Sequence, residues 1–223
     1  MNVDWFVPAL AAHASPLASA YDIECRAAST TRVVLTFDDG PHAEGTSAVL
    51  DELARAGATA TFFLVGEQVE RHPELARAIV EAGHEVGIHG YRHTLLLRRR
   101  VAALSGDLDR ALDAITSVTG AVPTLYRPPY GVFSSGALAH VRTRGWRPLL
   151  WSTWGRDWER RATPQSIARR ATRGLAPGDV VLLHDSDAYS SAGSWRRTAA
   201  ALPLVLEAVA RLGAEASSFT HST

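Results

Sequence analysis

The stretch Val33-Val34-Leu35-Thr36-Phe37-Asp38-Asp39-Gly40-Pro41 decides how this chain folds. Its first five residues form a continuous run of apolar and β-branched side chains, which predicts a buried strand. The following Asp-Asp-Gly-Pro cannot continue a strand and predicts a loop. Apolar residues then recur at helical spacing over residues 47–56 and stop at Gly57, a residue suited to a left-handed helix end. The opening unit is therefore a strand, a loop and a helix.

This unit repeats along the chain. Further strands are predicted at 60–65, 85–88, 123–127, 147–151 and 179–183, and further helices at 74–82, 105–119, 136–144, 164–173 and 196–212. Pro203 predicts a kink or a second helical piece in the last of these. Six or seven strands alternating with helices predict an α/β fold with a parallel sheet, either a distorted, incomplete βα barrel or an open doubly wound sheet. No Gly-rich phosphate fingerprint follows the first strand, which weakens the nucleotide-binding form of the open sheet.

Composition restricts both the domain count and the partners. With 223 residues, 46% of them hydrophobic, the chain can bury the core of one domain, and no long linker interrupts it. The 23 basic residues equal the 23 acidic ones, so no long-range field would gather nucleic acid or anionic lipid. Cys25 is the only cysteine, which excludes an intramolecular disulfide and a thiolate metal cluster. Any metal ligands are therefore expected to be histidines and carboxylates.

The first 30 residues lack the pattern of a signal peptide. No Lys or Arg precedes Arg26, and residues 5–12 make a poor apolar segment. No stretch is apolar and long enough to predict a membrane span. These features predict a cytoplasmic protein, although a secreted protein whose leader had been removed would have the same sequence.

Four polar clusters directly follow predicted strands, and in a parallel barrel these strand ends share the face where active sites lie. They are Asp38-Asp39, His89 to His93, Arg127 to Gly131, and His184-Asp185. His89 and His93 are four residues apart, so both imidazoles would point to one side of a helical turn. Together with one carboxylate they would form a two-histidine, one-carboxylate metal set with positions open to water and substrate.

Each cluster also has an ordinary structural interpretation. The two histidines could be solvated loop residues, Asp-Asp before Gly-Pro is common turn chemistry, and His184 could pair with Asp185 or Asp187. The two-histidine cluster and the Asp-Asp cluster occur together in one βα array, and this favours the metal site. Adjacent carboxylates ionise together only beside positive charge, which a divalent cation and Arg127 would supply, leaving one Asp to bind metal and the other to act as general base. Histidine titrates near neutral pH, so His184 suits a general acid.

Five motifs occur in order: TFDDGP (36–41), HGYRH (89–93), RPPYG (127–131), RDW (156–158) and LLHD (182–185). Through them the chain resembles the polysaccharide deacetylases of the NodB homology domain, carbohydrate esterase family 4. The resemblance implies a distorted (β/α)7 barrel in which residues 32–223 form the catalytic domain and residues 1–31 an N-terminal extension packed on it. It also implies a divalent ion, Zn²⁺ with Co²⁺ or a similar ion as substitute, and removal of N-acetyl groups from amino sugars.

The resemblance also implies a role for each motif residue. Asp39, His89 and His93 would bind the metal, and Asp38 would be the base, held in place by Arg127. The backbone N–H of Tyr130 would stabilise the oxyanion together with the metal, and His184 would protonate the leaving amine. Trp158 and Leu182 would hold the acetyl methyl group, and Tyr91 would contact the substrate. The other tryptophans of this region could be core residues or could stack on sugar rings.

Two departures from the family pattern affect these roles. A Ser or Thr usually follows the first ligand histidine and braces the loop, whereas Gly90 has no hydroxyl. Trp154 stands where an Asp that tunes the acid histidine is expected, and Asp157 is expected to lie too far along the chain to replace it. The proton-donor role of His184 is accordingly less well supported than the metal site.

The leading functional hypothesis is a metal-dependent hydrolase that removes N-acetyl groups from an amino-sugar substrate, whether an oligosaccharide, a glycan or a soluble sugar intermediate. The altered fourth motif motivates an alternative in which the same site hydrolyses a non-sugar amide, imide or ester. A catalytically inactive carbohydrate-binding homologue is a third hypothesis, which predicts that a ligand or the base is missing. The four residues Asp38, Asp39, His89 and His93 are all present, which argues against it.

Overall fold

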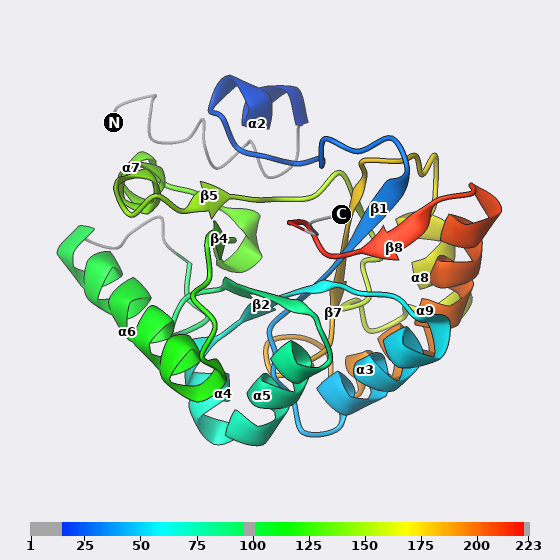
Figure 1. Ribbon diagram of the computed structural model, residues 1–223, viewed down its shortest axis with the longest axis horizontal. Coiled ribbons are helices and arrows are strands. Elements are labelled where there is room, and N and C mark those ends of the chain that lie inside the picture. Colours follow the sequence, from blue (N-terminus) through cyan, green and yellow to red (C-terminus); the bar gives the residue numbers. More distant parts are fainter. Residues whose placement is uncertain (1–14, 96–100, 221–223) are drawn as a thin grey trace.

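A parallel sheet curled into a distorted barrel forms the centre of the computed structural model, which describes residues 15–95 and 101–220 (Figure 1). The strand order is β5-β4-β3-β2-β1-β7-β6, and every neighbouring pair is parallel. An additional strand, β8, pairs with the first half of β1. It lies on the same side of β1 as β2, which pairs with the second half. The strands are β1 (Arg32–Asp38), β2 (Thr61–Leu64), β3 (Glu85–Ile88), β4 (Leu125–Tyr126), β5 (Arg147–Pro148), β6 (Thr153–Trp154), β7 (Val180–His184) and β8 (Glu215–Ser217).

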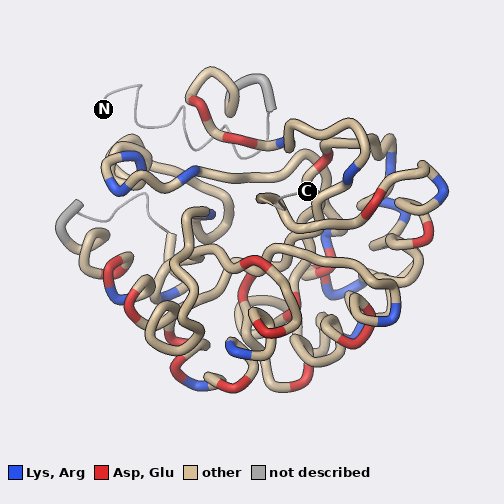
Figure 2. The backbone as a smooth tube through the Cα atoms, in the orientation of Figure 1, with Lys and Arg blue, Asp and Glu red and all other residues tan. Residues whose placement is uncertain are grey.

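Helices surround the outside of this sheet. Figure 1 shows α6, α4, α5, α3, α9 and α8 as an arc around its convex side, so the predicted distorted (β/α)7 barrel is confirmed and the open doubly wound sheet is excluded. Positive and negative residues are interspersed along these helices (Figure 2). The helices are α2 (Ser15–Ala20), α3 (Gly45–Ala56), α4 (Gly66–Arg71), α5 (Pro73–Glu81), α6 (Val101–Thr119), α7 (Ser135–Thr143), α8 (Pro164–Ala171) and α9 (Ser194–Arg211), with a 3₁₀ turn, η3, at Pro129–Gly131.

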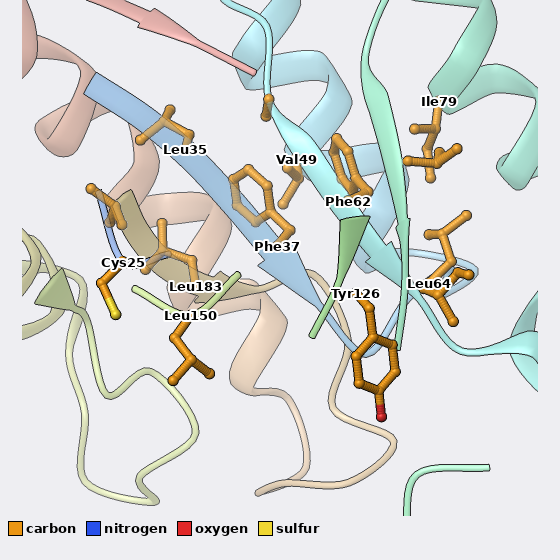
Figure 3. Packing of buried hydrophobic residues seen from close by; sticks show 14 of the residues in the cluster. Cys25, Leu35, Phe37, Val49, Phe62, Leu64, Ile79, Tyr126, Leu150 and Leu183 are labelled. Atoms are coloured by element: carbon orange, nitrogen blue, oxygen red, sulfur yellow. The ribbon is translucent and has the colours of Figure 1, made fainter. Parts of the chain in front are cut away.

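The alternation of side chains along β1 separates the core from the site. Val33, Leu35 and Phe37 point toward the helices and join the main hydrophobic cluster, where Phe37 stacks on Phe62 of β2 at 5.1 Å between ring centroids (Figure 3). The residues between them face the concave side of the sheet, where Val34 joins a smaller cluster. Since side chains alternate strictly along a strand, Asp38 is on this concave side, at the carboxyl end of β1.

The strand predicted at residues 147–151 is broken, and this break distorts the barrel. β5 ends at Pro148, and β6 begins only at Thr153, where the chain has moved beside β7. Between them, the N–H of Leu149 bonds to Tyr126 O and that of Leu150 bonds to Glu24 O, at 3.0 and 2.7 Å. Because Leu149 and Leu150 lie in the break and belong to neither strand, their carbonyls are available to accept hydrogen bonds from side chains.

The described part of the N-terminal extension covers this break. Glu24 pairs with the segment after β5, Arg26 pairs with Asp179 ahead of β7, and the side chains of Ile23 and Cys25 are buried in the main cluster. Residues 1–14 of the expected extension lie outside the described residues. Among the residues described, no helix combines the length and the apolar character needed to cross a bilayer.

Several short elements differ from the sequence-based expectation. The helices α2 and α4 and the short strands β6 and β8 were not predicted, because each has six residues or fewer and carries no periodic pattern. Pro203 does not divide α9, which runs without interruption from Ser194 to Arg211.

Replacing Phe62 with Ala should lower the free energy of unfolding by about 3–5 kcal/mol, because the ring is fully buried between β1 and the helices and its loss leaves a cavity. Urea denaturation of the two proteins measures this difference. The matched change Val122→Ala, at a side chain 70% exposed, should shift the free energy of unfolding by less than about 0.5 kcal/mol. Equal effects at the two positions would contradict the assignment of Phe62 to the core.

Candidate active site

The four predicted polar clusters meet in one pocket of about 400 Å³ at the carboxyl ends of the strands. Asp38 and Asp39 come from the end of β1, His89 and His93 from the segment after β3, and His184 from the end of β7. A larger hollow, of about 560 Å³, lies near the amino ends of the strands between α3, α9 and β8, and it is lined by two glutamates but no histidine. The pocket at the carboxyl ends is therefore the candidate site.

Asp39, His89 and His93 form the group suited to a metal ion. Asp39 Oδ1 lies 3.2 Å from His93 Nε2 and 3.5 Å from His89 Nε2, and the three ligand atoms are all within 4.8 Å of one another. Asp39 Oδ1 is buried and accepts no hydrogen bond from the residues described, so an acceptor atom is available at the centre of the group. Two imidazoles and one carboxylate are a donor set that Zn²⁺ and similar divalent ions favour, so these residues fit such an ion.

Neighbouring groups orient His89 for this role. Its Nδ1 lies 2.7 Å from the carbonyl oxygen of Arg127, and a carbonyl oxygen can only accept. Nδ1 therefore carries the proton, and Nε2, which faces Asp39, has its lone pair free for a cation.

The HGYRH segment is held in place although Gly90 lacks a hydroxyl. Gly66 and Glu67, at the start of α4, donate backbone hydrogen bonds to the carbonyls of Gly90 and Tyr91, both at 3.0 Å. The N–H of Tyr91 donates to Asp107 of α6 at 2.8 Å. Gly90 has a φ of 87°, a left-handed conformation that glycine adopts without strain. Backbone bonds and Asp107 thus brace the segment in place of the usual Ser or Thr.

Tyr189, from the segment between β7 and α9, supports the second histidine. Its ring stacks on His93 with 4.3 Å between centroids and 13° between planes. The Tyr189 hydroxyl donates to Glu67 at 2.8 Å and accepts from Gln68 at 3.1 Å, so the ring itself is fixed. Tyr189 belongs to none of the five motifs, and its role was not predicted from the sequence.

Protonation states agree with metal binding. Burial alone would raise the pKa of Asp39, but the neighbouring His89, His184 and His93 side chains lower it to about 2. Burial lowers the pKa of His93 to about 4, even though the Asp39 carboxylate opposes this effect. At neutral pH Asp39 is therefore ionised and His93 is neutral, which are the forms that bind metal.

Asp38 has a different partner from Asp39. Its Oδ1 accepts a hydrogen bond of 2.7 Å from Arg127 Nη1, and both side chains are buried. Arg127 also donates to Thr36 Oγ1 and, across the break after β5, to the carbonyls of Leu149 and Leu150, at 2.8, 3.1 and 2.7 Å. The pairing predicted between Arg127 and Asp38 is therefore present, and every nitrogen of the guanidinium has an acceptor.

His184 pairs with Asp157, which corrects the expectation that Asp157 lies too far along the chain. His184 Nδ1 is 2.9 Å from Asp157 Oδ1, and Asp157 Oδ2 accepts from the His184 N–H and from Thr198 Oγ1, at 2.7 and 2.8 Å. Arg156 makes this possible by turning the chain with a φ of 51°. Burial would lower the pKa of His184, but the Asp157 carboxylate outweighs it and raises this pKa to about 10.

The suggested pairing of His184 with Asp185 or Asp187 is wrong. Asp187 lies beside His42, 3.2 Å from its Nε2. Asp185 is buried beneath the loop after β1, where Thr46 donates to it, and burial raises its pKa to about 7. A Cβ atom on Gly40 would collide with the Asp185 carboxylate, so the Asp-Asp-Gly-Pro turn needs glycine at this position.

Aromatic and apolar side chains form the remaining wall. Trp158 and Leu182 line the pocket as predicted, together with Trp151 and Trp154. Ring centroids are 5.7 Å apart from Trp151 to Trp154 and 5.4 Å apart from Trp154 to Trp158, so the three indoles are continuous. Gly131, next to the exposed Tyr130, has a φ of 67° and leaves no room for a Cβ beside Trp151.

Tyr91 does not contribute to this wall, contrary to the expectation that it contacts the substrate. Its hydroxyl donates to Glu70 at 2.8 Å, and the guanidinium of Arg110 lies 3.7 Å from the centre of its ring. The side chain is buried between α4 and α6, and its role is to anchor the ligand-bearing segment.

Comparison with known proteins identifies related sequences. A family model described as polysaccharide deacetylase matches residues 26–149. The chitooligosaccharide deacetylase of Bradyrhizobium sp. (strain ANU 289) is 36% identical over 193 residues, which cover 83% of this chain and 88% of that protein. The peptidoglycan-N-acetylglucosamine deacetylase PgdA of Listeria monocytogenes is 33% identical over 160 residues, 72% of this chain but only 34% of PgdA. The match to this chain thus spans about a third of the length of PgdA.

Solved structures share the fold. The Bc1960 peptidoglycan N-acetylglucosamine deacetylase superposes with a TM-score of 0.83 and 26% identity, over 90% of this chain and 92% of that one. The CE4 family pseudoenzyme BA3943 from Bacillus anthracis superposes with a TM-score of 0.77 and 25% identity, over 86% of this chain and 64% of that one. The fold is therefore shared with a pseudoenzyme as well. Similarity in fold alone does not indicate catalysis, which has to be inferred from the individual residues of the site.

Replacing His93 with Ala should weaken Zn²⁺ binding by more than the roughly 10–100-fold that loss of a supporting residue costs, because a ligand is removed. Asp38→Asn, the matched control, should bind Zn²⁺ with nearly unchanged affinity, since the amide keeps an acceptor for Arg127. Isothermal titration and the metal content after dialysis measure both. Equal loss of metal in the two variants would contradict the division of roles between Asp38 and Asp39.

Proposed function

This chain belongs to the polysaccharide deacetylase family, and from that premise we propose that it is a metal-dependent hydrolase that removes N-acetyl groups from an amino-sugar substrate. The observation that carries the proposal is the arrangement of three units in one pocket: the metal-binding set, the Asp38–Arg127 pair and the His184–Asp157 pair. Hydrolysis of an amide needs an activated water, a stabilised oxyanion and a protonated leaving nitrogen. Each unit meets one or more of these needs.

In this proposal Asp38 is the general base, and Asp39, His89 and His93 are the metal ligands. A divalent cation on Asp39, His89 and His93 would polarise the amide carbonyl and lower the pKa of water at an open coordination position. Zn²⁺ is our choice of ion because two histidines and a carboxylate are a common catalytic zinc set. Asp38 accepts the proton of the attacking water through the carboxylate oxygen that Arg127 does not occupy, which lies 3.8 Å from His89 Nε2. The Arg127 guanidinium keeps this carboxylate oriented toward the pocket.

His184 is the general acid. Its Nδ1 is held by Asp157, so its Nε2 is the nitrogen available to give a proton to the leaving amine as the C–N bond breaks. The products are then acetate and the free amine. The backbone N–H of Tyr130, at the rim of the pocket, is proposed as a second donor to the oxyanion, next to the cation.

The apolar wall suits the acetyl group and the sugar. Trp158 and Leu182 offer a surface for the methyl group, and the continuous indoles of Trp151, Trp154 and Trp158 offer faces on which sugar rings stack. The names of the related deacetylases, which refer to chitooligosaccharides and peptidoglycan, support an N-acetylated sugar substrate. The alternative of a non-sugar amide substrate depends on the absence of a carboxylate beside His184, and Asp157 supplies that carboxylate.

EDTA-treated enzyme should release no acetate from N-acetylglucosamine oligomers, and added Zn²⁺ or Co²⁺ should restore the release. The measurement is acetate released from a panel running from monosaccharide to polymer, with Asp38→Asn as a metal-binding control that should lose about 10²–10⁴-fold in kcat. Failure of the metal-loaded wild-type enzyme to release acetate from every member of the panel, combined with hydrolysis of small cyclic amides, would overturn the sugar proposal.

Asp157→Asn should move the high-pH limb of the kcat profile to lower pH. The Asp157 carboxylate stabilises protonated His184, so its removal lowers the pKa of the acid, and the proton is lost at a lower pH. Glu159→Gln, two residues away and paired with Arg170, should leave the limb in place. A limb that does not move in Asp157→Asn would show that His184 is not the acid.

A further inference from the structure

Positive charge is concentrated in the segment that follows β6. All 23 basic residues of the chain are arginines, and six of them fall within residues 156–173, together with only two acids, Asp157 and Glu159. The charge of Asp157 is engaged by His184. In a chain whose formal net charge is zero, this segment is therefore strongly positive.

Three of these arginines line a hollow of about 280 Å³. Its lining consists of Trp154, Arg156, Arg170 and Arg173, with no carboxylate among the described residues that form it. The guanidinium of Arg156 lies over the Trp154 ring, 4.8 Å from its centroid. Such stacking holds the guanidinium plane in one orientation.

One acid offsets only part of this charge. Glu159 lies 2.8 Å from Arg170 and 3.7 Å from Arg156. Arg173 is exposed, and its side chain makes no ion pair or hydrogen bond with the described part of the chain. Three guanidiniums facing one carboxylate leave the hollow with a net positive charge at any pH where Glu159 is ionised.

The hollow adjoins the active site through a single side chain. Trp154 belongs to the lining of both the catalytic pocket and the arginine hollow. A glycan whose reacting sugar occupies the pocket can therefore place a neighbouring substituent against the arginines. Arginine recognises planar carboxylates with two parallel N–H donors, so the complementary substituent is a carboxylate.

We propose that the hollow of Arg156, Arg170 and Arg173 is a subsite for a carboxylate carried by the substrate, so that the enzyme prefers acidic N-acetylated oligosaccharides to neutral ones. The proposal rests on the proposed deacetylase function and extends it from the reacting amide to the class of glycan. Trp154, which replaces an acidic residue expected at this point of the motif, forms the partition between the two sites.

The test compares two tetrasaccharides that differ only in charge. One is an alternating N-acetylglucosamine and N-acetylmuramic acid tetrasaccharide with free carboxylates, and the other is the same molecule with these carboxylates converted to primary amides. For the Zn²⁺-loaded wild type, kcat/KM should be about three- to fivefold higher for the acid, the range expected for a partly exposed charge contact. The preference should shrink as NaCl is raised, because salt screens the contact.

Arg173→Gln should abolish most of this preference, because kcat/KM should fall more for the acid than for the amide. Arg173 is the suitable position because it makes no described contact that its loss would break. Arg169→Gln is the matched control: it removes one charge from an exposed position on α8, next to Arg170 but outside the lining of the hollow, and should keep the preference. Equal kcat/KM for acid and amide in the wild type, or equal effects of the two variants, would overturn the subsite.

Binding separates failure of the subsite from failure of the proposed reaction. Both tetrasaccharides are titrated by calorimetry into Zn²⁺-loaded Asp38→Asn, with and without Arg173→Gln. Tighter binding of the acid that depends on Arg173 supports the subsite, even if no acetate is released by the wild type. Equal binding of the two molecules overturns it, even if both are deacetylated.

Discussion

Arg127 and Asp38 form a buried ion pair that joins the end of β1 to the segment after β4 and to the break after β5. A guanidinium with no solvent exposure requires an acceptor for each nitrogen, and here the acceptors are Asp38, Thr36 and two main-chain carbonyls. Those carbonyls are available only because the sheet breaks after Pro148. The break in the sheet and the orientation of the Asp38 carboxylate are thus parts of one network. Such a pair adds little net stability, but removing one partner alone typically costs about 3–5 kcal/mol.

A second charged pair lies at the same pocket, and in it the charges have exchanged roles. The Arg127 guanidinium holds the carboxylate of Asp38, whereas the carboxylate of Asp157 holds the imidazole of His184 and raises its pKa to about 10. Burial would lower the pKa of His184, so the Asp157 carboxylate is what keeps this imidazole protonated at neutral pH. Asp39, His89 and His93, the group suited to a metal ion, line the same pocket as Asp38 and His184.

Sequence reasoning found the chemical groups of the site but misjudged two of their neighbours. Spacing along the chain puts Asp157 too far from the usual motif position to replace the missing acid, yet the left-handed turn at Arg156 brings it to His184. Tyr91 was expected in the pocket because it lies between the two ligand histidines, but its side chain turns away to Glu70. Tyr189 had no motif at all, and only its ring on His93 reveals its function. Each of these contacts depends on backbone direction over one or two residues, which sequence spacing does not specify.

The strand at residues 33–37, the βα repetition and the gathering of the polar clusters at one end of the sheet can all be predicted from the sequence. These follow from local rules, since side chains alternate along a strand and polar residues after parallel strands share one edge of the sheet. Only the tertiary structure decided where the sheet breaks, which carboxylate holds His184, what braces the segment from His89 to His93, and that Trp154 joins the catalytic pocket to three arginines. The physical reason is that these outcomes arise from burial and hydrogen-bond satisfaction between elements distant in the chain. Such requirements act only once the elements have packed together.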